Sequence, residues 1–144
     1  MRCGGKRKLF RISTALIRNC ADANVTAFQI ESEDAEPDLA NNDPQRGVVY
    51  GYRVKKQLTP DPAQLKKVRL IITDLDSYKT AMPNCFEPGM IFQFREGSNT
   101  TTVFICTFCG LAYIYDETKM RRMPLTRAAC FALEDVYEAL FHSK

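Results

Sequence analysis

Apolar and polar positions alternate along residues 48–56, which predicts a β-strand with one apolar face. Val48, Tyr50, Tyr52 and Val54 occupy every second position, so an extended chain places their side chains on the same side. The positions between them hold glycine, arginine and lysine besides one valine. We therefore expect this strand to pack one face on a core and to expose the other.

Three further runs rich in β-branched and aromatic residues lie between residues 89 and 116. They cover residues 90–95, 101–106 and 111–115. Two short sequences typical of turns separate them, Glu-Gly-Ser-Asn and Thr-Phe-Cys-Gly. We predict that the three runs form an antiparallel meander.

Two amphipathic helices are predicted, one before the meander and one after it. Asp61 is placed to cap a helix over residues 62–77, and Thr126 is placed to cap a helix over residues 127–141. Apolar residues recur at three- and four-residue spacing in both. The stripes consist of Leu65, Val68, Ile72 and Leu75 in the first helix and of Ala129, Leu133, Val136 and Leu140 in the second. The expected fold class is α+β, an antiparallel sheet of about four strands (the meander plus the strand at 48–56) covered by two helices.

Composition divides the chain into three parts. Residues 1–30 are rich in Arg and Lys and show only brief patterns for a helix at 9–17 and a strand at 25–30, so we expect a weakly structured basic tail. Residues 31–46 combine acids, prolines and asparagines with few large apolar side chains, which is typical of a linker. The remaining residues, 47–144, are expected to form a single domain.

Charge and hydropathy bear on partners and compartment. The chain has 20 Lys and Arg against 17 Asp and Glu, a net charge of +3, which does not favour nucleic acid or a membrane surface as a partner. No apolar run approaches the roughly 20 residues of a membrane span. The basic start precedes an apolar run at 12–17 that is too short for a secretory signal. We expect a soluble, cytoplasmic domain, with export as the alternative.

Strand pairing in the meander predicts that three cysteines meet. If its first turn centres on residues 97–98, Met90 pairs with about Cys106. Cys85, which precedes the first strand, then lies beside the turn that ends at Cys109. The register therefore brings together residues that are some 20 positions apart in the sequence.

The turn at residues 106–110 has the sequence Cys-Thr-Phe-Cys-Gly, which is similar to the knuckle of zinc ribbons and rubredoxin-like sites. Gly110 tolerates the left-handed conformation that this turn needs. Zinc is therefore the cofactor to consider, and a structural zinc ion takes four ligands. The ligand set would be Cys85, Cys106 and Cys109, with Cys130 or His142 as the fourth ligand and Cys3 or Glu87 as further options.

Two other interpretations of the cysteines stay open. Free cysteine is often a small buried core residue, so some or all of these side chains fit simple packing. A disulfide or redox pair is the other option, and it needs an oxidising compartment or a lowered thiol pKa. The CxxC sequence joins two strands, whereas redox catalysts place theirs at a helix start, so redox catalysis has the least support.

Several short motifs resemble a family of uncharacterised small bacterial domains. Their pattern is a helix ending in Ser-Tyr, then Cys-Phe-x-Pro, a strand and Ile-Cys-Phe-x-Cys. This chain has Ser-Tyr at 77–78, Cys-Phe-Glu-Pro at 85–88 and Ile-Cys-Thr-Phe-Cys at 105–109. It departs at 89–90, where Gly-Met replaces the Arg-His of many members, and the second phenylalanine is shifted by one position. The resemblance spans about residues 65–140 and implies no established activity.

The residue types present favour binding over catalysis. His142 is the single histidine, which excludes a histidine-based triad and a two-histidine metal site. No set of nucleophile, base and acid stands out. We expect a non-enzymatic binding or interaction domain with a structural three-cysteine cluster and a protein partner. The alternatives are a zinc-binding module and a thiol redox or disulfide-containing protein.

Overall fold

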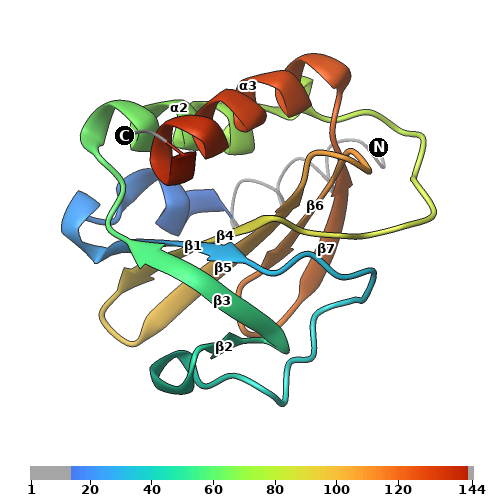
Figure 1. The fold of residues 1–144 in the computed structure, drawn as a ribbon. Helices are drawn as coiled ribbons and strands as arrows, with labels where there is room; N and C mark the ends of the chain where they lie inside the picture. Colours follow the sequence, from blue (N-terminus) through green and yellow to red (C-terminus); the bar gives the residue numbers. More distant parts are fainter. Residues whose placement is uncertain (1–13, 143–144) are drawn as a thin grey trace.

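A seven-stranded antiparallel sheet forms the centre of the computed structural model, which describes residues 14–142 (Figure 1). Its spatial order is β2-β3-β1-β4-β5-β6-β7. The strands are β1 (Val25–Ile30), β2 (Val48–Val49), β3 (Tyr52–Leu58), β4 (Met90–Glu96), β5 (Asn99–Cys106), β6 (Leu111–Tyr115) and β7 (Met120–Pro124). The meander predicted between residues 89 and 116 is present as β4, β5 and β6.

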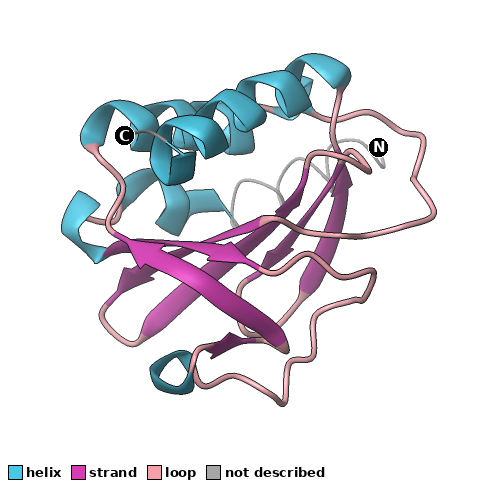
Figure 2. Ribbon diagram, viewed as in Figure 1, coloured by secondary structure: helices cyan, strands magenta, loops and turns pink. Residues whose placement is uncertain are grey.

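Helices cover one face of this sheet, as Figures 1 and 2 show. They are a helical segment over residues 14–19, α2 (Pro62–Thr73) and α3 (Arg127–Tyr137), which continues into a π-helical turn, Glu138–His142. Short 3-10 turns occur at Asp22–Asn24, Pro44–Arg46 and Leu75–Ser77. Both predicted caps are confirmed, because Asp61 Oδ1 accepts from the N–H of Gln64 at 2.9 Å and Thr126 Oγ1 accepts from that of Ala129 at 3.2 Å.

The prediction of about four strands covered by two helices is wrong, because the sheet has seven strands and three helices lie on it. Strand β7 carries two adjacent arginines and shows no sustained alternation of apolar and polar positions. The single strand predicted over residues 48–56 is instead two antiparallel strands, β2 and β3, because Tyr50 and Gly51 have positive φ angles of 47° and 89° and turn the chain between them. Strands β2 and β7 lie at the two edges of the sheet, where one row of backbone N–H and C=O groups has no neighbouring strand.

Part of the segment expected to be a basic tail lies inside the sheet. Strand β1 occupies an interior position between β3 and β4, where Ala27 pairs with Leu58 on one side and with Phe92 on the other. Ile17 and Val25 are completely buried. The folded body therefore includes residues well before 47. Composition misplaced the start of the folded domain because a polar segment after β1 does not indicate where β1 itself packs. Residues 1–13 of the predicted tail lie outside the described part of the chain.

Each face of the sheet has its own core. The face under the helices is filled by residues of α2, α3 and the strands, with Leu65, Phe92 and Leu133 among those that are fully buried. The opposite face carries a second cluster, which includes Phe28 and Phe104. This explains why so many strand residues are apolar in sequence, since both sides are covered.

Residues 31–46, expected to be a solvated linker, cover the second face (Figure 2). The segment has little regular structure and is mostly exposed, as expected, but several hydrogen bonds hold it against the strands. The Tyr52 hydroxyl donates to the carbonyl of Ala35, and the Tyr113 hydroxyl donates to Glu36 Oε1 at 3.0 Å. The N–H of Asp38 donates to the carbonyl of Tyr50 at 2.8 Å. We call it the 31–46 strap.

Candidate functional site

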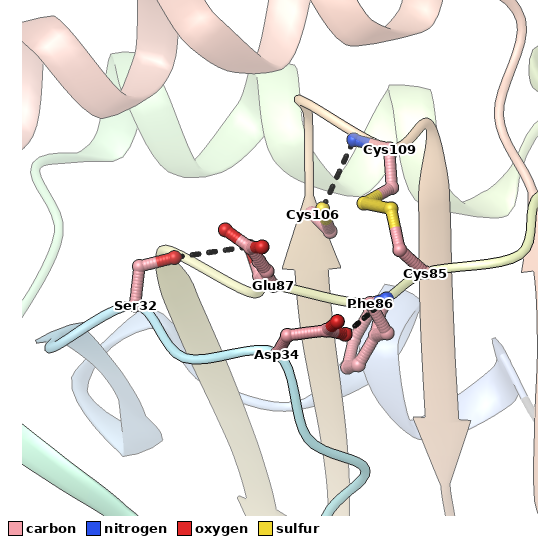
Figure 3. Close-up of a disulfide and its surroundings, with 7 residues drawn as sticks. All are labelled: Ser32, Asp34, Cys85, Phe86, Glu87, Cys106 and Cys109. Atoms are coloured by element: carbon pink, nitrogen blue, oxygen red, sulfur yellow. Dashed lines mark hydrogen bonds between the residues drawn. A yellow bond between two sulfur atoms is a disulfide. The ribbon is translucent and has the colours of Figure 1, made fainter.

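A disulfide joins Cys85 to Cys109 at one end of the sheet (Figure 3). Their Cα atoms are 6.1 Å apart, although the two residues are 24 positions apart in the chain. The register that brings them together is close to the predicted one. Met90 pairs with Ile105, where about Cys106 was predicted, and the first turn of the meander does lie at residues 97–98.

Cys106 is a buried free thiol beside this disulfide. The backbone N–H of Cys109 donates to Cys106 Sγ over 3.1 Å (Figure 3). Burial raises the pKa of the Cys106 thiol, while backbone N–H groups of Cys109, Glu87 and Phe108 act in the opposite direction. The net effect favours the neutral thiol, which is a weaker nucleophile and metal ligand than the thiolate.

The residues proposed as zinc ligands are only partly brought together. Cys85 and Cys109 are bonded to each other, so in this oxidised form their sulfur atoms are not thiolates. Cys130 is buried at the start of α3, near the turn: a Cβ atom added at Gly110 would lie 3.7 Å from Cys130 Sγ. His142 is elsewhere, with Nδ1 3.3 Å from Glu138 Oε2. Within residues 14–142, no group of three or more His, Cys, Asp or Glu is arranged to hold a metal ion.

Zinc binding by these cysteines stays a prediction that concerns the reduced protein. Cys3, one of the further options for a ligand, lies outside the described residues. Glu87, the other option, follows Cys85 by two positions. Its backbone N–H forms a hydrogen bond that acts to lower the pKa of the Cys106 thiol.

The turn between β5 and β6 is tightly held, yet it presents a large apolar side chain. Gly110 has φ +74°, the left-handed conformation predicted for it, and its N–H donates to the carbonyl of Cys106 at 3.0 Å. The carbonyl of Gly110 accepts from Leu125 at 2.8 Å. Phe108, in the middle of the turn, is 85% exposed. The disulfide and these hydrogen bonds thus fix the backbone on both sides of an exposed aromatic ring.

A cleft of about 380 Å³ opens between this turn and α3. Its walls come from the ends of β4 and β5, the turn, the residues after Cys85 and the C-terminal part of α3. Its lining residues include Glu87, Met90, Phe108, Glu134, Tyr137 and Glu138. The cleft therefore combines an apolar floor and an exposed ring with three carboxylates.

The 31–46 strap reaches the same region from the other side. Ser32, which also lines the cleft, donates through Oγ to the carbonyl of Glu87 at 3.4 Å, and Asp34 Oδ1 accepts from the N–H of Phe86 at 3.4 Å (Figure 3). The loop between Cys85 and β4 is thus held by the disulfide, by the strap and by the sheet. This wall of the cleft is preformed.

Sequence reasoning noticed the cysteines but missed the cleft. In the sequence, Phe108 stands out only as part of the Cys-Thr-Phe-Cys-Gly turn, and no motif points to Glu134. The four-residue spacing of Glu134 and Glu138 is a signal that both acids share one side of α3. That this side faces the β5–β6 turn depends on how α3 crosses the sheet, which no local pattern encodes.

Comparison with known proteins gives no relative: no family model, no curated protein and no solved structure matches this chain. The resemblance to small bacterial domains therefore stays a prediction. Among the helices of the described residues, none is long and apolar enough to cross a lipid bilayer.

Proposed function

We propose that this chain is a non-enzymatic interaction domain that binds a segment of a protein partner at the disulfide-bonded end of its sheet. The observation that carries the proposal is Phe108, which is 85% exposed on a turn fixed beside a preformed cleft. Keeping a phenylalanine in water instead of burying it forgoes roughly 1.5–3 kcal/mol of stabilisation. Binding of a partner over Phe108 would recover much of this free energy.

The rigidity of the turn supports the same conclusion. A binding surface that is already ordered loses little conformational entropy when a ligand binds, so more of the contact energy appears as affinity. Aromatic side chains next to a pocket are the residues that most often dominate binding energy at protein interfaces. The disulfide between Cys85 and Cys109 restricts the backbone of the turn and so keeps this surface ordered.

A peptide selection tests the proposal without knowing the partner. Peptides that bind the oxidised protein would be selected from a random library, and their dissociation constants measured for wild type, Phe108→Ala and Leu70→Ala. Leu70 is the matched control because it is 62% exposed but lies on α2, away from the cleft. We expect Phe108→Ala to weaken binding roughly tenfold or more, as loss of an aromatic anchor does. Failure to select peptides, or equal binding by the two variants, would overturn the proposal.

Thiol–disulfide exchange is a second candidate, because Cys106 lies directly beside the disulfide. The Cys106 thiolate would attack Cys109 Sγ, forming a Cys106–Cys109 bond and releasing Cys85 as a thiolate that takes up a proton. The raised pKa of Cys106 opposes this step, which is why we place it second. Peptide mapping of disulfides after incubation at alkaline pH tests it: a Cys106–Cys109 bond should appear, and an unchanged Cys85–Cys109 bond would exclude the exchange.

A further inference from the structure

We propose that the segment bound in the cleft carries a basic side chain, Lys or Arg, beside an apolar residue that packs on Phe108. This inference rests on the proposed function and specifies the chemistry of the partner. Three features of the site support it: the charges around the cleft, the spacing of two of these charges on α3, and the shape and apolar surface of the site.

The charges around the cleft have one sign. Glu87, Glu134 and Glu138 line it, and no Lys or Arg does so among the described residues. His142 approaches Glu138, with Nδ1 3.3 Å from Oε2, but it is not part of the lining. The chain as a whole is nearly balanced, with 20 Lys and Arg against 17 Asp and Glu, so the charge of the cleft is more one-sided than that of the whole chain. A cationic side chain would find complementary charge there.

The position of two of these acids on α3 is unfavourable for the free protein. Glu134 of α3 and Glu138, the first residue of the π-helical turn that continues α3 to His142, lie on one helical segment. They are also four residues apart, a spacing at which like charges repel each other. In the last turn of this helical segment, His142 lies near Glu138, with Nδ1 3.3 Å from Oε2. A bound cation would relieve the repulsion between the two carboxylates, which gives this region a reason to prefer a basic ligand that does not depend on the cleft's shape.

The apolar surfaces suit the remainder of such a ligand. Phe108 offers an exposed ring, and aromatic rings attract Lys and Arg heads through the cation–π interaction. Long basic side chains lay their methylene stems along apolar surface while the charged head reaches polar groups. The volume of about 380 Å³ lies near the lower limit for ligand pockets. It fits a few side chains of an extended peptide better than a large cofactor.

The peptides selected with the oxidised protein test this inference. We expect them to be enriched in Lys or Arg next to an apolar residue, and to bind less tightly as salt is raised. Replacing Glu134 by Gln should weaken binding roughly three- to fivefold. Asp135→Asn is the matched control, since it removes the same charge from the exposed neighbouring position on α3, outside the cleft lining, and should leave binding within about twofold.

A second set of measurements links the two partners of the interaction. For each selected peptide, changing its basic residue to Gln should weaken binding to wild type but have little further effect on Glu134→Gln, because both changes remove the same contact. Equal effects of Glu134→Gln and Asp135→Asn would overturn the inference. So would peptides without basic residues that still depend on Phe108, a result that leaves the proposed function standing. Peptides that ignore Phe108 would overturn both.

Discussion

Cys85 is bonded to Cys109 because β4 and β5 form a tight hairpin that returns the chain to its starting point. Residues before β4 and after β5 are neighbours at the same end of the sheet, whatever their separation in sequence. The bond closes a loop across 24 positions and ties the segment before β4 to the β5–β6 turn. The cleft and the exposed Phe108 lie beside this connection.

Removing the disulfide should therefore destabilise the protein. We predict that Cys85→Ser combined with Cys109→Ser lowers the free energy of unfolding by about 3 kcal/mol, because the open loop gives the unfolded chain more conformational freedom. Urea unfolding followed by circular dichroism measures this quantity. Dithiothreitol should lower the stability of wild type to nearly the same degree and leave the double variant unchanged. An oxidised wild type no more stable than the double variant would contradict the presence of the bond.

The helices and the meander could be predicted because their signals are local. Asp61 and Thr126 cap helices where the sequence indicated, since a cap depends on neighbours three residues away. The β4–β5 register was predicted to within one residue because Gly97, with φ +61°, marks the turn and strand pairing then fixes the rest.

The interior strand β1 could not be placed in the same way. Its partners β3 and β4 follow it at distances of tens of residues, so its position in the sheet depends on contacts that no short window contains. The cleft could not be predicted from a short window either, because Phe108 and Glu134 line it together only as a result of how α3 crosses the sheet. Local patterns thus define the elements, whereas the site arises from how the elements are assembled.

Residues before the strap contribute to stability in a way that a flexible tail would not. Phe28 of β1 is almost completely buried in the second core, so Phe28→Ala should lower the free energy of unfolding by about 3–5 kcal/mol. Phe131→Ala is the matched control, because Phe131 is 59% exposed on α3, and its change should stay within about 0.5 kcal/mol. Chemical unfolding measures both. Similar small effects of the two substitutions would show that β1 is not part of the core.

Tyr113 and Glu36 connect the sheet to the 31–46 strap, and their contact should make stability depend on pH in the alkaline range. The Tyr113 hydroxyl donates to Glu36 Oε1 at 3.0 Å, and Arg122 both pairs with Glu36 and stacks on the Tyr113 ring at 5.5 Å. Burial, and then the hydrogen bond to the Glu36 carboxylate, raise the pKa of Tyr113 to about 12. The phenol must therefore keep its proton to donate this hydrogen bond to the strap.

The sign of the pH effect follows from that shift. A pKa that is higher in the folded state than the usual value of about 10 means that the folded protein binds the proton more tightly. The stabilisation is complete below pH 10 and is lost as the pH rises from about 10 to about 12. Tyr113→Phe should cost about 1 kcal/mol at neutral pH through the lost hydrogen bond and should remove this part of the alkaline loss. The difference in phenolate absorbance between wild type and Tyr113→Phe reports the titration of Tyr113 alone. Glu36→Gln should move that titration to lower pH, and an unchanged midpoint in this variant would mean that Glu36 does not accept a hydrogen bond from Tyr113.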